Sequence, residues 1–194
     1  MKESRIRTSA THPLLIAEVA AGSGGGIVGI TFCPGKTGSS LWGPHWQRDL
    51  AVDIDVIARW GASVVVTLIE DHEFAMLGVV GLGTAVQARG MAWHHLPIVD
   101  VRPPGESFER QWQEVGPALR SALRAGGRVL VHCRGGLGRA GTVAARLLVE
   151  MGMAPGNAIN RVRAVRPGAI QTQAQQDYVM KTRSASSSGG VEVE

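Results

Sequence analysis

Cysteine is scarce in this chain, with two residues among 194, and no long apolar segment is present. Two cysteines without a pairing pattern argue against a disulfide framework and favour a reducing compartment, so we expect a cytoplasmic location. No apolar run approaches the ~20 residues that span a membrane. The apolar stretch at 14–21 is short and interrupted by Glu18, which makes it a poor signal-peptide core. We therefore expect a soluble protein without a membrane partner.

Long blocks of basic residues are also missing, although the chain carries a formal charge of +4. The positive charges are mainly arginine and are scattered along the sequence. This balance favours anionic ligands without choosing among phosphoproteins, nucleotides and RNA. Because no basic block is present, we do not expect nucleic acid as a partner.

The order of the apolar segments predicts an α/β protein. At 194 residues the chain is long enough for a single domain with a sizeable core. Strand-like and helix-like segments alternate, which favours a central, mostly parallel sheet of about five strands flanked by helices. We expect a flexible arm at 1–12, one domain at 13–183 and a disordered tail at 184–194. The expected strands are 14–20, 27–32, 63–69, 91–97 and 129–132, the expected helices are 47–60, 106–125, 139–151, 155–165 and 172–183, and 33–43 is expected to be a loop.

Residues 129–142 (VLVHCRGGLGRAGT) combine three features that phosphate chemistry requires. An apolar strand leads into Cys133, a glycine-rich loop follows, and Arg139 lies six residues after the cysteine. Apolar residues at helical spacing begin at Arg139, so the loop should end at a helix N-terminus. Unpaired N–H groups and the helix dipole attract a phosphate there, and a guanidinium can hold two of its oxygens. The same positive field should favour the thiolate form of Cys133.

The spacing of Cys133 and Arg139, with His132 before the cysteine, resembles the protein tyrosine phosphatase superfamily. Residues 93–109 (WHHLPIVDVRPPGESFE) are similar to the general-acid loop of its dual-specificity members. Residues 168–179 (GAIQTQAQQDYV) are similar to the segment that positions the hydrolytic water. A segment like HHLPIVD and a GGLGR loop occur together in the kinase-associated phosphatase branch, which this chain resembles most.

The resemblance implies a single-domain phosphatase fold and a role for each matching residue. Cys133 would be the nucleophile, and Asp100 would protonate the leaving oxygen, with Glu106 as the alternative acid. His132 would orient the loop and tune the thiolate. No metal or organic cofactor is implied. The phosphate would be held by the Arg139 guanidinium and by the loop N–H groups, those of Arg134, Gly135, Gly136, Leu137, Gly138 and Arg139.

Gln171 and Gln175, four residues apart, are expected on one helix face, where their neutral amides would place the hydrolytic water. In isolation these glutamines indicate little, and their weight comes from the resemblance. Other candidates also have ordinary structural interpretations. Cys133 could be a buried cysteine at a strand end, and Asp100 could cap a turn.

Glu70, Asp71 and Glu73 follow the apolar strand expected at 63–69. They would lie at the carboxyl end of the sheet, where α/β proteins place their sites. We expect one of these carboxylates to brace Arg139 and select Glu70 for that role; the alternative is an acidic turn in solvent. Cys33 could be a resolving thiol, but one loop cysteine is weak evidence for that.

Ala140 departs from the superfamily pattern, which usually has serine or threonine directly after the arginine. That hydroxyl normally hydrogen-bonds to the cysteine sulfur when the sulfur becomes the leaving group. We therefore expect the groups needed for attack by Cys133 to be complete and the second step, hydrolysis of the phosphocysteine, to be slow.

These features predict a monomeric cysteine-dependent phosphatase for phosphorylated proteins or other phosphate monoesters. Phosphotyrosine is the expected substrate group, with phosphoserine and phosphothreonine as further candidates. Two alternatives stay open. Rhodanese-type sulfurtransferases also carry a cysteine on a loop that ends at arginine, although their loop is usually one residue shorter. A phosphate-binding pseudophosphatase with slow or no turnover is favoured only by Ala140.

Overall fold

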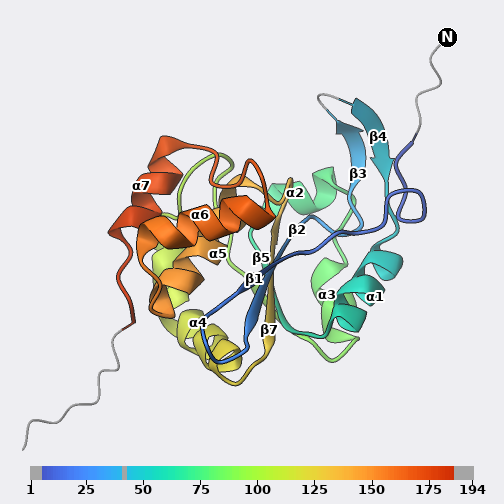
Figure 1. Ribbon diagram of the computed structural model, residues 1–194. Helices are drawn as coiled ribbons and strands as arrows, with labels where there is room; N and C mark the ends of the chain where they lie inside the picture. Colours follow the sequence, from blue (N-terminus) through green and yellow to red (C-terminus); the bar gives the residue numbers. More distant parts are fainter. Residues whose placement is uncertain (1–5, 41–42, 186–194) are drawn as a thin grey trace, which may run out of the picture.

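A five-stranded, mostly parallel sheet forms the centre of the protein, as expected (Figure 1). The structure, a computed structural model, describes residues 6–40 and 43–185. Within the sheet β1 is antiparallel to β2, the other pairings are parallel, and β7 lies in the middle. The strand order is β1 (Ala17–Ala20), β2 (Ile27–Phe32), β7 (Arg128–Cys133), β5 (Ala62–Thr67) and β6 (Ala92–His95).

Helices cover both faces of this sheet (Figure 1). Two apolar clusters fill the spaces between the sheet and the helices. Strands β5 and β7 contribute to both clusters, which explains their continuous apolar sequences. Within the described ranges no helix is long and apolar enough to cross a membrane. One layer consists of α4 (Glu106–Arg124), α5 (Gly138–Glu150), α6 (Pro155–Val165) and α7 (Gln173–Lys181), and the other of α1 (Leu50–Trp60), α2 (Asp71–Met76) and α3 (Leu82–Gln87).

Local signals in the sequence account for several element boundaries. Helix α1 begins after Asp49, whose side chain accepts a hydrogen bond from the Val52 N–H, and it ends at Gly61, which has φ +86°. Helix α6 spans the expected residues 155–165. Helix α5 is buried on nearly all sides because it lies between the sheet and the helices α6 and α7. Its position between two layers matches its nearly all-round apolar sequence.

Two expectations about local structure were wrong. The segment 33–43 was expected to be a loop, but much of it belongs to a hairpin of β3 (Thr37–Ser40) and β4 (Gly43–Gln47). Its polar, glycine-rich sequence has no strand periodicity, and contacts from elsewhere hold it, such as the Thr37 N–H to Leu77 carbonyl bond of 2.8 Å. Helices α2 and α3 were not predicted, because six residues each are too few for a helical period to stand out.

Residues 6–12, the described part of the expected N-terminal arm, pair with the hairpin. The Arg7 N–H donates to the His45 carbonyl at 2.9 Å, and the Gln47 N–H donates to the Arg7 carbonyl at 3.0 Å. The Arg7 guanidinium lies 5.1 Å from the centre of the Trp46 ring. These residues are therefore part of the fold rather than a free arm. Residues 1–5, 41–42 and the expected tail from 186 onward lie outside the described residues.

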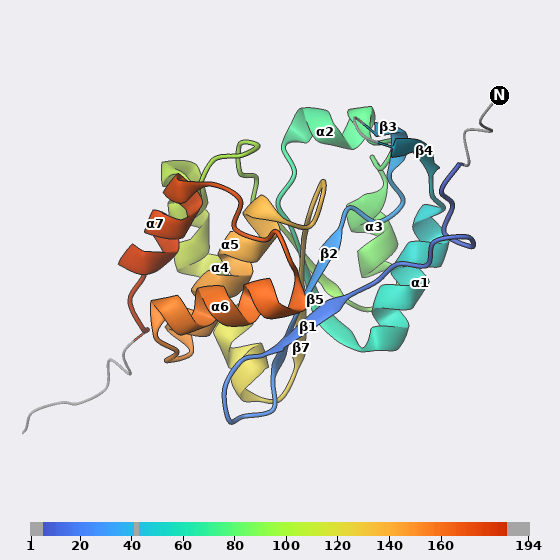
Figure 2. The same cartoon turned by 45° about the horizontal axis from the view of Figure 1, so that its top comes forward.

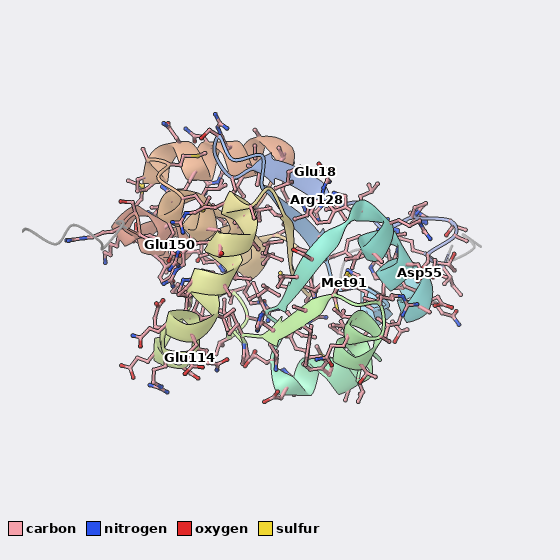
Figure 3. All side chains as sticks on the ribbon, turned by 90° about the horizontal axis from the view of Figure 1, so that it is seen from below. Glu18, Asp55, Met91, Glu114, Arg128 and Glu150 are labelled. Atoms are coloured by element: carbon pink, nitrogen blue, oxygen red, sulfur yellow. The ribbon has the colours of Figure 1, made fainter. Side chains whose placement is uncertain are left out.

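The two ends of the sheet differ in what surrounds them. At the carboxyl end, the loop from β7 to α5 lies on the same side of the molecule as α2 and the β3–β4 hairpin (Figure 2). At the opposite end, Glu18 and Arg128 lie side by side (Figure 3), with 3.6 Å between Oε2 and Nη1. Because open α/β sheets bind ligands at the carboxyl ends of their strands, the first of these ends is the place to look for a site.

Candidate active site

The loop that joins β7 to α5, residues 133–139, is called the Cys133 loop below. Gly136 has φ +66°, and a Cβ there would lie 2.5 Å from the Thr31 carbonyl group. Any other residue would therefore clash with the backbone of β2. A Cβ at Gly135, in contrast, would meet nothing within 4 Å. Gly136 is thus the residue that lets this loop turn so close to the neighbouring strand.

Two basic side chains hold the carbonyl oxygens of the Cys133 loop. Arg166 donates from Nε to the Gly136 carbonyl at 2.9 Å and from Nη2 to the Gly135 carbonyl at 3.1 Å. Lys36 Nζ donates to the Arg134 carbonyl at 3.3 Å. Because Arg166 and Lys36 bind the loop carbonyl oxygens, the loop N–H groups remain available to bind an anion. Neither Arg166 nor Lys36 was predicted from the sequence, although Arg166 lies just before the block at 168–179.

Arg139 is almost completely buried, and its donors are nearly all used. Nη1 donates to Glu73 Oε2 at 2.5 Å and to the Ile98 carbonyl at 3.1 Å. Nη2 donates to Glu73 Oε1 at 3.0 Å and lies 3.0 Å from Asp100 Oδ1. Nε has no hydrogen-bond partner in the part of the chain that the structure describes. The guanidinium therefore keeps one buried donor for a ligand.

Glu73, rather than the selected Glu70, is the carboxylate that holds Arg139. Glu73 lies in the first turn of α2, only 2 % exposed, and also accepts a hydrogen bond from the Glu70 N–H at 2.8 Å. Burial by itself would raise the pKa of Glu73, but hydrogen bonds from Arg139 and the Glu70 N–H outweigh burial and lower it. The choice of Glu70 failed because the short helix α2, which was not predicted, turns Glu73 toward Arg139.

Asp100 lies at the rim of the site, with its side chain 53 % exposed. Besides its ion pair with Arg139, its Oδ1 accepts a hydrogen bond from the Val101 N–H at 3.1 Å, and its own N–H donates to Glu70 Oε2 at 3.3 Å. Val101 has φ +56°, which is unusual for a β-branched residue. The structure thus places Asp100 beside Arg139. Glu106, the expected alternative acid, is instead the first residue of α4 and is exposed.

Gln171 and Gln175 do not share a helix face, contrary to expectation. Helix α7 begins only after Thr172, so Gln171 precedes it, and Gln171 reaches the cleft. Gln175 is fully buried, where its Oε1 accepts from the Gln171 N–H at 2.9 Å and its Nε2 donates to the Arg102 carbonyl at 3.1 Å. A Cβ at Gly138 would lie 2.7 Å from Gln171 Oε1. Both Gln175 amide atoms would lie 3.0 Å from that Cβ, so both glutamines contact the loop at Gly138; Gln171 also lines the cleft, and Gln175 holds the Gln171 N–H.

His132 is completely buried directly before Cys133. Its Nε2 lies 2.8 Å from Thr67 Oγ1, which accepts a hydrogen bond from Trp93 Nε1 at 2.9 Å. Burial lowers the pKa of His132 to about 3, so the imidazole is neutral at physiological pH. A buried neutral imidazole fits the expected role of orienting the loop better than that of a base.

Ala140 and Cys33 complete the set of expected residues. Ala140 is fully buried at the start of α5. The hydroxyl of Thr142 on the same helix donates to the Gly138 carbonyl at 2.8 Å, so it does not replace the missing hydroxyl. Cys33 follows β2, and both it and Cys133 are free and buried. Burial raises the pKa of the Cys33 thiol, which keeps it neutral.

These groups meet in an open cleft of about 700 Å³ at the carboxyl end of the sheet. Cys133, Arg139 and the loop between them form its floor, and the hairpin, α2, the Asp100 loop and Gln171 form its walls. A cysteine, a helix N-terminus and an arginine held by a carboxylate thus line one cleft. The lining residues are Lys36, Thr37, Gly38, Trp46, Met76, Leu77, Asp100, Val101, Cys133, Arg134, Gly135, Leu137, Gly138, Arg139 and Gln171.

Comparisons with known proteins agree with this arrangement. Residues 45–179 match the family described as "PTP-SAK: Swiss Army Knife protein, DSP-PTPase phosphatase domain". Cyclin-dependent kinase inhibitor 3 of Rattus norvegicus is 33% identical over 140 residues, 71% of this chain. Protein tyrosine phosphatase type IVA 3 of Homo sapiens is 31% identical over 134 residues, 69% of this chain and 72% of that protein.

Solved structures extend the likeness to the fold. A crystal structure of kinase associated phosphatase, with its catalytic cysteine replaced by serine, has a TM-score of 0.74 and 27% identity and covers 86% of this chain and 92% of that one. Tk-PTP in its active form has a TM-score of 0.62 and 28% identity, covering 84% and 93%. The chain belongs to the dual-specificity group of the protein tyrosine phosphatase superfamily and is similar to its kinase-associated phosphatase branch. It spans 65% of the length of the rat relative.

Proposed function

We propose that this protein hydrolyses phosphate monoesters, phosphotyrosine first and phosphoserine or phosphothreonine second, through a phosphocysteine intermediate on Cys133. The observation that carries the proposal is the environment of Arg139. Its guanidinium is buried and fixed by Glu73, yet Nε has no hydrogen-bond partner among the described residues, and Arg139 lines the same cleft as Cys133. A buried, fixed cation with a spare donor is suited to an anion such as phosphate.

In the first step, the Cys133 thiolate attacks phosphorus, and the bond between phosphorus and the leaving oxygen breaks. The Arg139 guanidinium and the loop N–H groups from Arg134 to Arg139 hold the other phosphate oxygens, because donors fixed before the reaction stabilise the charge that develops. Asp100 gives its proton to the leaving oxygen. Covalent catalysis of this kind divides one difficult displacement into two easier ones.

Asp100 has to move for this step. A phosphate held side-on by Arg139 would take Nε together with Nη2, and Nη2 now lies 3.0 Å from Asp100 Oδ1. Phosphate binding therefore releases the Asp100 carboxyl from the arginine and leaves it at the rim of the cleft. There it is beside the oxygen that needs a proton. The exposed position of Asp100 permits this movement.

In the second step, water attacks the phosphocysteine, Asp100 takes the proton of that water, and phosphate and the Cys133 thiolate are released. Gln171 reaches the cleft and is the residue that orients the water, while Gln175 holds the Gln171 backbone from behind. No hydroxyl follows Arg139 to stabilise the departing sulfur, since position 140 is alanine. We therefore expect this second step to limit turnover.

The natural substrates are proposed to be phosphoproteins in the cytoplasm. The name of the human relative, a protein tyrosine phosphatase, supports phosphotyrosine as the substrate group. The cleft walls include Trp46, Met76 and Val101, which suit an aromatic ring. We also expect catalysis without a metal or cofactor.

Steady-state hydrolysis of an aryl phosphate and of a phosphotyrosine peptide tests the proposal. We expect the wild-type protein to hydrolyse both in the presence of a metal chelator. Cys133→Ser should abolish turnover and retain binding of the phosphopeptide in titration calorimetry. Turnover that survives this substitution would contradict the role of Cys133.

A phosphate-binding pseudophosphatase is the second candidate, because Ala140 weakens the release of the sulfur. Rapid-quench kinetics with an aryl phosphate separate the two functions. A slow but competent enzyme gives a burst of phenol that approaches one per site, followed by steady turnover. A pure binding module gives no phenol.

A further inference from the structure

Lys36 lies in the cleft beside the Cys133 loop, and the proposed chemistry does not use it. Its Nζ donates to the Arg134 carbonyl at 3.3 Å and lies 4.5 Å from the ring centres of both Phe32 and Trp46. The two aromatic faces and the loop thus fix the position of the ammonium group at the wall of the cleft. The β3–β4 hairpin, which directly follows Lys36 and carries Trp46, was not predicted from the sequence pattern.

Half-buried Lys36 differs from the buried cations Arg48 and Arg139 in having no carboxylate partner among the described residues. Arg48 is paired with Asp53 at 2.7 Å, and Arg139 with Glu73 at 2.5 Å. Among the described residues, no carboxylate lies within 4.0 Å of Lys36 Nζ. Burial lowers the pKa of Lys36 to about 8, so burial of this charge is unfavourable. An anion that reaches the cleft wall would offset that cost.

Both cations and thiols surround Lys36. Arg134, which also lines the cleft, has no carboxylate within ion-pair distance in the described part of the chain. Burial lowers the pKa of Lys36 most, the charges of Arg48 and Arg134 lower it further, and Cys33 and Cys133 raise it. Lys36 and Arg134 therefore give the cleft lining two cations without a carboxylate partner among the described residues, whereas Asp100 in the same lining is paired with Arg139.

We propose that Lys36, with Arg134 beside it, binds a second anionic group of the substrate: a carboxylate or phosphate on the residue next to the phosphotyrosine of a peptide. This inference rests on the proposed phosphatase function and adds a specificity to it. A peptide suits the cleft better than an inositol phosphate, because Trp46, Met76, Leu77 and Val101 give the walls apolar surface that an aromatic ring can cover.

The test compares two phosphotyrosine peptides that differ only in the neighbouring residue, glutamate or glutamine. For the wild-type protein, kcat/KM should be about tenfold higher for the glutamate peptide, as expected for one hydrogen bond between charged groups. Lys36→Met keeps an apolar side chain of similar length and should reduce this ratio to near one. Lys36→Arg should retain most of it.

Lys181 provides the matched control, since this exposed lysine of α7 lies away from the cleft. Lys181→Met removes the same charge from the protein and should leave the ratio of the two peptides at its wild-type value. A ratio near one in the wild-type protein overturns the proposal. So does an unchanged ratio in Lys36→Met, because a lysine that only holds the Arg134 carbonyl would affect both peptides equally.

Binding to the Cys133→Ser protein keeps this test independent of turnover and examines pH as well. The titratable or charged groups that face Lys36 are Cys33, Cys133, Arg48 and Arg134, and the serine substitution removes Cys133 from the titration. The preference for the glutamate peptide should be largest at pH 6.5 and disappear as the pH rises through about 8. A preference that is constant from pH 6.5 to 9.5 contradicts the role of Lys36.

A soluble inositol bisphosphate and the matching monophosphate form a third arm. If Lys36→Met abolishes discrimination between these two compounds but not between the peptides, the assigned occupant is wrong. If neither peptide is hydrolysed by the wild-type protein, the proposed function fails, and the calorimetric comparison still decides whether Lys36 binds the second anion.

Discussion

Two buried arginines each donate two hydrogen bonds to one carboxylate, and we propose different roles for them. Arg48 pairs with Asp53, and both side chains are 0% exposed; Arg139 pairs with Glu73, at 1% and 2%. By burial and charge alone the two pairs are nearly indistinguishable. The geometry of their nitrogens separates them.

Every side-chain nitrogen of Arg48 already donates a hydrogen bond to the protein. Its Nε and Nη2 donate to Asp53 at 2.7 and 2.8 Å, and its Nη1 donates to the His12 carbonyl at 2.6 Å. Asp53 also accepts from the Gly35 N–H at 2.8 Å. This pair connects the start of α1 to the segment before β1 and to the turn before β3. Arg139 meets its carboxylate through Nη1 and Nη2 and leaves Nε unpaired. What singles out Arg139 as a candidate for ligand binding is therefore a buried nitrogen without a partner among the described residues, not burial of the side chain.

Substitution of each arginine by lysine should separate the two roles most strongly. Arg139→Lys keeps the charge and loses the fork that holds phosphate, so kcat/KM for an aryl phosphate should fall by about 10³-fold or more. Arg48→Lys should instead lower the free energy of unfolding by about 1–3 kcal/mol, measured by urea denaturation, because buried hydrogen bonds are lost. Its kcat should stay near the wild-type value. If Arg48→Lys lowered kcat/KM strongly and Arg139→Lys did not, the proposed roles of the two arginines would be wrong.

Arg139 forms an ion pair with a second carboxylate, Asp100. Among the described residues, Arg48 has only Asp53 within ion-pair distance. If Asp100 is the general acid, Asp100→Asn should slow the hydrolysis of alkyl phosphates by about 10²-fold more than that of aryl phosphates, since only poor leaving groups need the proton. Parallel kcat measurements on the two substrates check this. Equal losses would mean that another group, such as Glu106, is the acid.

Glu73→Gln and Asp53→Asn test the two carboxylates. Glu73→Gln loosens Arg139, so we expect kcat to fall by about tenfold, the effect of one charged hydrogen bond; Asp53→Asn should affect stability only. Because the pKa of Glu73 is lowered in the fold, its contribution to stability is present above its ordinary value of 4.5 and is lost as the pH falls below it. The difference in unfolding free energy between wild type and Glu73→Gln should therefore shrink from pH 7 to pH 3.5. A constant difference would contradict the lowered pKa.

Ala140→Ser is the only one of these changes expected to raise activity. A hydroxyl beside the departing sulfur supplies one hydrogen bond to a charged group, which corresponds to roughly tenfold in the rate of phosphoenzyme hydrolysis. The steady-state rate should rise, and the burst seen in rapid-quench experiments should shrink. An unchanged rate together with no burst would show that this step does not limit turnover.

The residues predicted correctly from sequence are those whose neighbours along the chain decide their position. Cys133 and Arg139 are six residues apart on a strand–loop–helix unit, so the spacing alone brings them to one loop. The helix that starts at Pro155 was predicted because proline favours the first helical turn. The β3–β4 hairpin and α2 have no such local pattern, because contacts from distant segments hold them. Trp46 and Glu73, which those elements carry, and Lys36, which directly precedes β3, were missed or misassigned for that reason.

The sequence by itself determined the Cys133 loop, the alternation of strands and helices, and the family, because each depends on local spacing or on order along the chain. Tertiary structure alone decided which carboxylate holds Arg139, which glutamine reaches the cleft, and which arginine keeps an unpaired nitrogen. Each of these depends on the angle at which two distant segments meet. Neighbouring residues of a helix with 3.6 residues per turn point in directions about 100° apart, so a small rotation of the helix changes which side chain faces the site. Only packing against the rest of the protein determines that rotation.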